Sequence, residues 1–564
     1  MTRWIGIRRG QTGHTDAMTA QRTSSAVQDW IAHDPDPVTA AELRACSPEE
    51  LERRFARPLR FGTAGLRGPL RGGPAGMNLA VVLRATWAVA QVLKARGHAG
   101  SGVIVGRDAR HHSDEFALAA AEVLAAEGFS VTLMFTAVPT PVLAFAVRHN
   151  RAAAGIQITA SHNPATDNGY KVYFEGGLPI VSPVDREIEE AMADAPHADE
   201  ISRRPVEPSG VDVIQRYVER AAHVRRTHDP VRVALTPLHG VGGEFVMDAL
   251  VRAGCTDVHV VESQFAPDPD FPTVPSPNPE EPAAVEAVLK LAAEVDAEIA
   301  IALDPDADRC AVGIPTPTGW RMLSGDETGW LLGDYILAQL DDGPVTTSTL
   351  VASTVVSSRM LAAIADAHGA RHVETLTGFK WLVRADADLP GSSLVYAYEE
   401  AIGHCVDPSA VRDKDGISAA VLCCDLVAAL RAQGRTVLDA LDDLARRFGV
   451  HTTTASSRRV EDPDQAAAML DRLRRRPPTE LTGFPVTVTD LARAEGARRT
   501  DALIFEGGTA DTAVRVVVRP SGTEPKVKFY FEVRRSCHDD EDLDIARARA
   551  RELQDELVAT VDQW

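Results

Sequence analysis

The sequence predicts an α/β protein, because short apolar strands alternate with helix-favouring segments along most of the chain. The apolar segment 102–106 is followed by the alanine-rich segment 116–127, which favours a helix, and then by apolar residues 130–135. Similar apolar segments recur at 152–158, 231–235, 258–261, 298–303 and 351–353. Such strands predict parallel sheets covered by helices on both faces. Ligands of these sheets bind beyond the carboxyl ends of the strands, so functional residues are expected in the loops that follow strands.

The length of 564 residues predicts about four domains. Breaks are indicated by the proline-rich, charged stretch 197–208 and by residues 326–328. A third break is indicated by residues 446–458, which precede a mixed segment with strands at 513–518 and 527–533. We therefore expect domains at 1–208, 209–325, 326–450 and 451–564. The proline-dense run 266–282 is too rigid for a helix and is expected to form a loop.

The composition limits the kinds of partner that the chain can have. A formal net charge of −21 argues against nucleic acid or an anionic membrane as a partner. No apolar run of about 18 residues is free of charges, so no transmembrane helix is expected. The polar segment 1–17 lacks the apolar stretch of a signal peptide, and Met18 offers a second candidate start. Seven cysteines without a CxxC pair argue against a disulfide framework or a structural zinc site, and they fit a cytoplasmic location.

The first candidate site is the segment TASHNP at residues 159–164, directly after an apolar strand. Pro164 disfavours a helix at the preceding residue, so Ser161 is expected on a loop. A serine in this position can act as a nucleophile if a base and an electrophile stabiliser lie nearby. Lys171 follows in the segment DNGYK. There is no GxSxG pattern, so a hydrolase elbow is not supported, and a turn stabilised by Ser and Asn side chains is the plain alternative.

The second candidate site is the segment DPDADR at residues 304–309, directly after the strand 298–303. Its three alternating aspartates can turn carboxylate oxygens onto one ion, and such hard ligands suit Mg²⁺. An EF-hand is excluded, because Arg309 stands at the sixth position instead of Gly and Pro315 at the twelfth instead of Glu. A solvated acidic turn is the alternative, although close like charges repel unless a cation or Arg309 offsets them.

Four further segments combine glycines or carboxylates with cations: RPSGT at 519–523, FGTAGLRG at 61–68, YEEAIGH at 398–404 and TGFKW at 377–381. The first offers hydroxyls and a guanidinium for a phosphate, and the second allows close backbone approach to an anion. The adjacent carboxylates of the third can bind vicinal sugar hydroxyls. Each can instead be a surface turn. The segment GVGGEF at 240–245 lacks the third glycine of GxGxxG, and no P-loop is present.

Together and in this order, TASHNP with NGYK, DPDADR and RPSGT resemble the α-D-phosphohexomutases, which interconvert sugar 1- and 6-phosphates. The resemblance runs from about Phe61 to about Phe531. It implies three similar mixed-sheet α/β domains and a smaller C-terminal α+β domain around a central cleft. Each domain would contribute one loop, which in chain order are the phosphoserine, metal-binding, sugar-binding and phosphate-binding loops.

The resemblance also implies the roles of single residues. Ser161 would carry a phosphoryl group, Lys171 would act as the general acid and base, and His162 and Arg67 would complete the catalytic set. One Mg²⁺ per chain would be held by Asp304, Asp306, Asp308 and Ser161. The implied substrate contacts are Thr63, Arg309, Thr377, Gly378, Lys380, Glu399, Glu400, Lys414, Arg519, Ser521, Gly522, Thr523 and Lys528. Ala401 stands where many members have serine. The EEAIG form, with FGTAGLRG and TGFKW, looks closest to the longer phosphoglucomutase- and phosphopentomutase-like members.

We therefore expect a mutase that interconverts hexose 1- and 6-phosphates, with glucose favoured and glucose 1,6-bisphosphate as intermediate and activator. Lys171 can remove the sugar proton if neighbouring Arg67 and Arg309 lower its pKa. Small sugar phosphates are the expected partners, and the expected assembly is a monomer or weak homodimer. The alternatives are phosphomannomutase or phosphopentomutase activity, a Mg²⁺-dependent phosphatase, and a non-catalytic sugar-phosphate-binding protein. Five of only seven lysines lie in or beside these loops, so an acidic chain can keep a cationic pocket.

Overall fold

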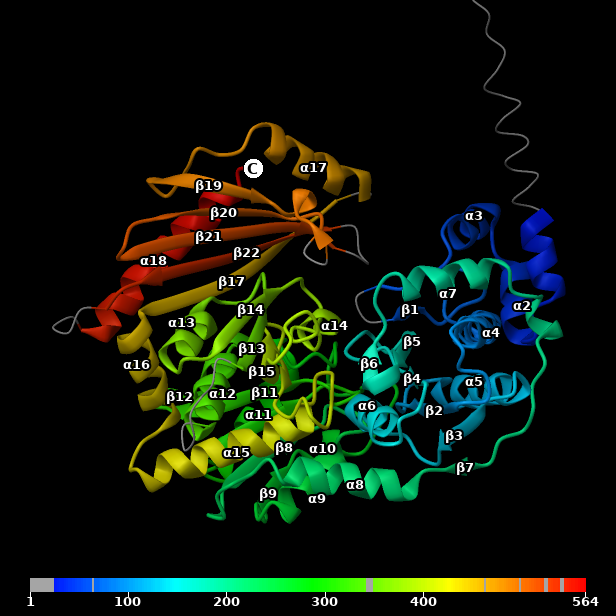
Figure 1. The fold of residues 1–564 in the computed structure, drawn as a ribbon, viewed down its shortest axis with the longest axis horizontal. Helices are drawn as coiled ribbons and strands as arrows, with labels where there is room; N and C mark the ends of the chain where they lie inside the picture. The colour runs from blue at the N-terminus through cyan, green and yellow to red at the C-terminus, as the bar shows by residue number, and fades with distance from the viewer. Residues whose placement is uncertain are drawn as a thin grey trace, which may run out of the picture.

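The computed structural model describes residues 25–62, 65–340, 348–460, 463–496, 499–521, 526–537 and 542–564. Four β-sheets follow one another along the chain, and helices pack against them (Figure 1). The first three sheets carry helices between their strands, whereas the last is a broad sheet of long strands (Figure 1). The expected domain boundaries stay a prediction.

The first sheet belongs to the N-terminal unit. Its strands are β1 (Leu66–Pro69), β2 (Gly102–Arg107), β3 (Ser130–Met134), β4 (Ala154–Ile158), β5 (Asp167–Phe174), β6 (Leu178–Pro179) and β7 (Pro208–Ser209). The helices are α2 (Pro37–Ala45), α3 (Pro48–Ala56), α4 (Leu79–Ala95), α5 (Ser113–Ala126), α6 (Thr140–His149) and α7 (Val184–Ala193), with short 3₁₀ turns η1 (Glu175–Gly177) and η2 (Ala198–Glu200). The strand order is β1-β5-β4-β2-β3-β7, with β6 paired to β5. β2 runs parallel to β3 and β4, whereas β5 returns antiparallel to β4.

The second sheet has the order β12-β11-β10-β8-β9. Its strands are β8 (Arg232–Thr236), β9 (Asp257–Val260), β10 (Ile299–Leu303), β11 (Cys310–Thr316) and β12 (Gly319–Met322). Its helices are α8 (Val211–Ala222), α9 (Gly243–Arg252), α10 (Glu262–Phe265) and α11 (Pro282–Glu294). β10 runs parallel to β8, and β11 returns antiparallel to β10.

The third sheet has the order β14-β13-β15-β16. Its strands are β13 (Thr349–Thr354), β14 (Arg371–Thr375), β15 (Ser393–Glu399) and β16 (Gly403–Cys405). Its helices are α12 (Gly325–Leu340), α13 (Met360–Ala367), α14 (Phe379–Leu382), α15 (Gly416–Ala432) and α16 (Val437–Phe448). β13 runs parallel to β14 and β15, and β16 returns antiparallel to β15.

The fourth sheet is antiparallel throughout, in the order β17-β22-β21-β20-β19-β18. Its strands are β17 (Val450–Arg459), β18 (Glu480–Leu481), β19 (Phe484–Asp490), β20 (Leu503–Gly508), β21 (Thr512–Pro520) and β22 (Lys526–Arg535). The helices are α17 (Pro463–Arg475) and α18 (Leu543–Val561), with the 3₁₀ turn η3 (Leu491–Arg493). This unit is the α+β part of the fold.

The expectation of three mixed-sheet α/β units is confirmed, because each of the first three sheets combines parallel strands with an antiparallel return. The three returns are β4 to β5, β10 to β11 and β15 to β16. In every case the loop of the return carries candidate residues, namely Ser161, the three aspartates and Glu400. Similar loops therefore recur in similar places in three mixed-sheet α/β units. The proline-dense run is a loop as predicted, and Pro282 begins α11.

One hydrophobic core extends through the first three units. It includes Val142 of α6, Leu235 of β8, Leu331 of α12 and Val421 of α15. The fourth unit encloses a core of its own, in which β17 and β22 pack against α18 and β21 packs against α17. A small cluster joins the two parts, with Val356 on one side and Tyr530 on the other.

No single helix in the described parts of the chain is long and apolar enough to cross a membrane. Among the described residues, α15 and α16 together have the length and apolar composition of such a span, but the two helices are bent by 87° relative to each other.

Candidate active site

Ser161 lies on the loop between β4 and β5, with a backbone φ of 53° and an exposed fraction of 1%. A positive φ is uncommon for a residue with a side chain and persists only where the surroundings enforce it. Here the hydroxyl of Thr159 accepts the backbone N–H of Ser161 at 2.9 Å. The Oγ atom of Ser161 donates to Asp304 Oδ2 at 2.7 Å and lies 3.2 Å from His162 Nδ1. The strained turn therefore aims the hydroxyl at the aspartate loop.

Arg110 holds this loop in place, although it was not among the residues predicted from the sequence. Its guanidinium donates to the backbone carbonyls of Ser161 at 2.6 Å, Asn163 at 2.5 Å and Pro164 at 2.7 Å. It also lies over the ring of Phe271, 5.0 Å from the centroid. Several donors in one rigid fork fix several carbonyls at once. The only available signal was its position in the loop after β2.

Asp304, Asp306 and Asp308 follow β10 and are buried, with exposed fractions of 0%, 0% and 1%. One oxygen of each carboxylate lies within 4.8 Å of the others. Burial, and then the two neighbouring carboxylates, raise the pKa of Asp304 well above its ordinary value. The Oδ1 atoms of Asp306 and Asp308 are buried and have no hydrogen-bond partner in the described structure.

These features fit a bound divalent cation. Carboxylate oxygens are the ligands that Mg²⁺ prefers, and unpaired buried oxygens are costly unless a cation or donor satisfies them. The serine oxygen that contacts Asp304 would complete an all-oxygen set. The donor chemistry of this site therefore matches the expected Mg²⁺.

Two nearby glycines allow the aspartate loop to take this shape. A Cβ on Gly240 would come within 2.4 Å of Pro305 Cα, and a Cβ on Gly242 within 2.6 Å of Ala307 Cβ. The backbone N–H of Val241 also donates to the Pro305 carbonyl at 2.8 Å. The glycine-rich segment at 240–243 therefore supports the aspartate loop, which explains its composition without a dinucleotide.

Lys171 lies on β5 and reaches across to the aspartate loop. Its Nζ atom donates to Asp306 Oδ2 at 2.6 Å and to Asp308 Oδ2 at 2.9 Å. Burial alone would lower the pKa of Lys171, but the two carboxylates outweigh burial and hold the pKa above its ordinary value. Arg67 opposes this rise, but it does not reverse it, so the condition that the pKa of Lys171 be lowered is not met.

Three further basic side chains surround the serine loop. Burial lowers the pKa of Arg67, whereas several carboxylates, Glu280 foremost, outweigh burial and raise that of Arg309. Glu280 belongs to the proline-dense loop, and its Oε2 atom lies 3.4 Å from Arg309 Nη1. Burial, and then the charges of Arg309 and Arg67, hold the pKa of His162 well below its ordinary value. The imidazole of His162 is therefore neutral at pH 7 beside two permanent cations.

The third unit contributes carboxylates and lysines to the same place. Burial raises the pKa of Glu399 to about 7, although the charges of Lys414 and Arg309 oppose the rise. Glu400 accepts from Ser357 Oγ at 2.9 Å and Thr354 Oγ1 at 3.1 Å. Lys414 Nζ lies 3.3 Å from Asp308 Oδ2, which brings the third unit into contact with the second.

The remaining candidates of the third unit lie on the loop before α14. Burial lowers the pKa of Lys380, whose Nζ atom donates to the carbonyl of Gly62 at 3.3 Å. Thr377 and Gly378 precede Lys380 in the chain, and all three residues line one cavity, which is described below. Gly378 has a φ of 111°.

The fourth unit contributes the loop between β21 and β22. Arg519 donates to the Tyr530 hydroxyl at 3.1 Å, and its buried Nε atom has no partner in the described structure. Ser521 donates its backbone N–H to the Lys526 carbonyl at 2.8 Å. Lys528 lies opposite Arg519 in the strand register. Three expected contacts, Thr63, Gly522 and Thr523, lie outside the described residues.

A single cavity of about 790 Å³ brings these loops together. From the candidate set it is lined by Arg67, Ser161, His162, Lys171, Asp308, Arg309, Thr377, Gly378, Lys380, Glu399, Glu400, Lys414, Arg519, Ser521 and Lys528. Asp304 and Asp306 are fully buried and contact the lining residues Ser161 and Lys171. Ser276 of the proline-dense loop and Tyr530 also line the cavity and were not predicted.

One cavity is surrounded by a turn that carries a nucleophile, by an acidic triad and by cations from all four units. This arrangement defines an enzyme that transfers phosphoryl groups. Family comparison agrees with this geometry. The chain matches the phosphoglucomutase/phosphomannomutase alpha/beta/alpha domain I over residues 58–198, domain II over 215–317, domain III over 324–448 and the C-terminal domain over 459–550. The chain belongs to the phosphoglucomutase/phosphomannomutase family, within the α-D-phosphohexomutases, and is a mutase of the phosphoglucomutase type.

Individual relatives have different names. A probable phosphomannomutase of Haemophilus influenzae is 39% identical over 470 residues, which cover 81% of this chain and 93% of the relative. A phosphopentomutase of Mus musculus is 33% identical, with 97% of this chain and 94% of the relative covered. The crystal structure of a phosphoglucomutase/phosphomannomutase family protein from Burkholderia thailandensis shares the fold, with a TM-score of 0.67, 22% identity and coverage of 88% of this chain and 97% of that one.

Proposed function

We propose that the chain interconverts hexose 1-phosphate and hexose 6-phosphate, with glucose favoured, through a phosphoserine at Ser161 and a 1,6-bisphosphate. The observation that carries this proposal is the Ser161 hydroxyl, held 2.7 Å from Asp304 and lining a cavity to which all four units contribute. Glucose 1,6-bisphosphate would serve as intermediate and activator.

In the first half-reaction the bond between Ser161 Oγ and phosphorus breaks, and a bond forms between a sugar hydroxyl oxygen and phosphorus. The proton of that hydroxyl ends on Ser161 Oγ, so atoms and charges balance. Lys171 is the proposed proton carrier. Because its ammonium is paired with Asp306 and Asp308, it must first give up a proton before it can accept one.

The proposed ligands of one Mg²⁺ per chain are Asp304, Asp306, Asp308 and Ser161, and the chemistry that Mg²⁺ supplies there is neutralisation of phosphoryl charge. Arg67 and Arg309 add fixed positive charge beside Ser161, and neutral His162 can hydrogen-bond without adding charge. These residues offset charge on the phosphoryl group from several sides.

The proposed sugar and phosphate contacts come from the two later units. Glu399 and Glu400 would bind sugar hydroxyls. Lys414 matches a lysine of the glucose-type members that the chain resembles, which is the reason for favouring glucose. The loop with Arg519 and Ser521, together with Lys528, would hold the phosphate that is not being transferred. Thr63, Thr377, Gly378, Lys380, Gly522 and Thr523 complete the proposed contacts. We further propose a cytoplasmic monomer or weak homodimer, divided into domains at 1–208, 209–325, 326–450 and 451–564.

The test is a parallel assay of glucose 1-phosphate, mannose 1-phosphate and ribose 1-phosphate, each with catalytic glucose 1,6-bisphosphate and Mg²⁺. We expect the highest kcat/KM for glucose 1-phosphate. An equal or higher kcat/KM for mannose 1-phosphate would instead indicate a phosphomannomutase, like the relative from H. influenzae. An equal or higher kcat/KM for ribose 1-phosphate would indicate a phosphopentomutase, like the relative from M. musculus. Release of inorganic phosphate in step with substrate loss would instead indicate a phosphatase.

A variant tests the phosphoserine directly. Ser161→Ala should abolish mutase activity and remove any mass increase of one phosphate from the purified protein. Ser130→Ala is the matched control, because Ser130 is exposed at the start of β3. Retained activity in Ser161→Ala would refute the proposed mechanism.

A further inference from the structure

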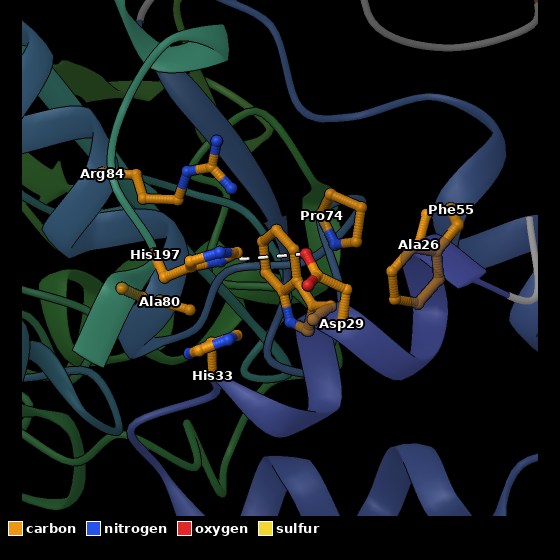
Figure 2. A pocket seen from close by; sticks show the side chains of 10 residues that line it. Ala26, Asp29, His33, Phe55, Pro74, Ala80, Arg84 and His197 are labelled. Atoms are coloured by element: carbon orange, nitrogen blue, oxygen red, sulfur yellow. Dashed lines mark ion pairs between the residues drawn. The ribbon is translucent and has the colours of Figure 1, made fainter. Parts of the chain in front are cut away.

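A second, smaller cavity of about 250 Å³ lies between the first helical segment and the chain around η2 (Figure 2). Its lining includes Asp29, Trp30, His33 and His197, and it shares no residue with the cavity described above. None of these residues belongs to the proposed mutase machinery. Two histidines and a carboxylate nevertheless face one another there.

The chain brings these groups together from two short segments. Asp29 and His33 are four residues apart at the end of helical residues 25–32, so they share a face. The backbone N–H of His33 still donates to the Asp29 carbonyl at 3.2 Å, which shows that the helical spacing holds there. His197 caps the N-terminus of η2, and Asp199 lies within η2.

The ligand atoms of Asp29, His33 and His197 all lie within 4.8 Å of one another. The two imidazole rings are stacked, with centroids 3.8 Å apart and an angle of 14° between their planes. His197 Nδ1 lies 3.8 Å from Asp29 Oδ2, the pair marked in Figure 2. The three ligand atoms are close enough for one ion to reach them all, provided that the stacked rings turn apart so that their nitrogen lone pairs converge on it.

Asp199 adds an outer contact. Its carboxylate lies 3.0 Å from Nδ1 of His33. In metal sites a carboxylate on one ring nitrogen fixes the tautomer and leaves the other nitrogen to ligate. Asp199 therefore prepares Nε2 of His33 for a metal.

We propose that Asp29, His33 and His197 form a second metal site, for a divalent transition ion of the Zn²⁺ class. Imidazole nitrogens favour Zn²⁺, Co²⁺ and Ni²⁺, whereas the all-carboxylate triad at residues 304–308 suits Mg²⁺. The three side chains have exposed fractions of 60%, 33% and 40%, so an ion can enter from solvent and keep water as a further ligand.

Such an ion would tie the first helical segment to the body of the first unit. Trp30 on this segment lies beneath the guanidinium of Arg84 of α4, 5.7 Å from the ring centroid. Val27 and Ile31 of the segment pack against Leu43 of α2. The site would therefore act as a structural clamp. The bound ion would make the N-terminal segment better ordered and would leave the mutase chemistry unchanged.

The test uses the full chain saturated with Mg²⁺ and titrated with Zn²⁺ by calorimetry, or with Co²⁺ by visible absorption. Wild type should bind one ion that the double variant His33→Gln, His197→Gln binds at least tenfold more weakly. His259→Gln is the matched control, because His259 also lies beside a carboxylate, 2.9 Å from Asp257, but belongs to no cluster of three ligands among the residues that the structure describes. Asp29→Asn is a second variant that keeps both rings.

A readout besides binding is limited proteolysis near residues 25–60, which Zn²⁺ should slow in wild type and in His259→Gln only. Mutase activity in Mg²⁺ should be the same in all four proteins. Equal Zn²⁺ affinity in wild type and the double variant would overturn the proposal, as would the absence of any Zn²⁺ binding by Mg²⁺-saturated wild type.

Discussion

The ammonium of Lys171 lies 2.6 Å from the carboxylate of Asp306, although Lys171 lies on β5 of the first sheet and Asp306 on the loop that joins β10 and β11 of the second. A second contact of 2.9 Å joins the same ammonium to Asp308. The acidic loop therefore has a counter-charge that the chain itself supplies. A cation held by the proposed metal ligands would share with Lys171 the offsetting of these carboxylate charges.

Replacing Lys171 by Gln should leave buried carboxylates without their counter-charge. We expect a loss of about 3–5 kcal/mol in the free energy of unfolding without Mg²⁺, and a fall in kcat of about 10²–10⁴-fold. Added Mg²⁺ should recover part of the stability. Urea unfolding in EDTA measures the loss in the free energy of unfolding, and urea unfolding in Mg²⁺ measures how much of it is recovered. Lys290→Gln is the control, because Lys290 is 76% exposed and its pair with Glu294 is long at 3.8 Å. Equal stability of Lys171→Gln and wild type in EDTA would contradict the argument.

Arg110 should act as a positioning residue, because its guanidinium holds the carbonyls of Ser161 and Asn163. Arg110→Lys keeps the charge but loses the fork, so the serine loop shifts. We expect kcat to fall by about 10²-fold, with a smaller change in KM. Steady-state kinetics gives both values. Arg96→Lys is the control. It alters an exposed ion pair with Glu187 and should change neither kcat nor KM. A rise in KM at constant kcat would mean that Arg110 acts on substrate binding instead.

Glu399 should make stability depend on pH. Folding raises its pKa from 4.5 to about 7, so the unfolded chain loses this proton at lower pH than the folded one. Its contribution to the free energy of unfolding is therefore greatest below about pH 4.5, falls as the pH rises to about 7, and then levels off. The loss amounts to about 3 kcal/mol.

Glu399→Gln cannot ionise and should lack this part of the pH dependence. Urea unfolding of the variant and wild type between pH 5 and pH 8 measures the difference. The KM for the sugar phosphate should also change near pH 7 in wild type only, since the ionised carboxylate is the better acceptor for sugar hydroxyls. Parallel pH profiles in the two proteins would reject this assignment.

Gly240 should be needed for the shape of the aspartate loop. A methyl group there would meet Pro305 Cα at 2.4 Å, so Gly240→Ala must displace backbone. We expect a loss of about 1–3 kcal/mol in stability and weaker Mg²⁺ activation of the mutase. Gly102→Ala is the control, because a Cβ at Gly102 meets no atom within 4 Å. Thermal unfolding and Mg²⁺ titration of activity compare the two, and unchanged Mg²⁺ dependence in Gly240→Ala would argue against support of the loop.

The sequence predicted the loops better than their contacts. Ser161 and the three aspartates could be found because each loop follows a short apolar strand, and that pattern is local. The contact between Lys171 and Asp306 joins residues 135 positions apart, so no local pattern reveals it. For the same reason the sequence could not show that the pKa of Lys171 is raised. Arg110, Glu280 and the glycines at 240–242 were missed as site residues for the same reason. Their roles depend on which segments meet in space.

The shared core of the first three units bears on how this chain can be divided. Residues of α6, β8, α12 and α15 belong to one apolar cluster, so a cut near 208 or 325 would expose faces that no neighbour covers. The fourth unit closes its own core around β21, β22 and α18. An exchange of gene fragments could therefore replace the last unit with that of a relative, together with its phosphate loop. The first three units would have to be inherited as one block.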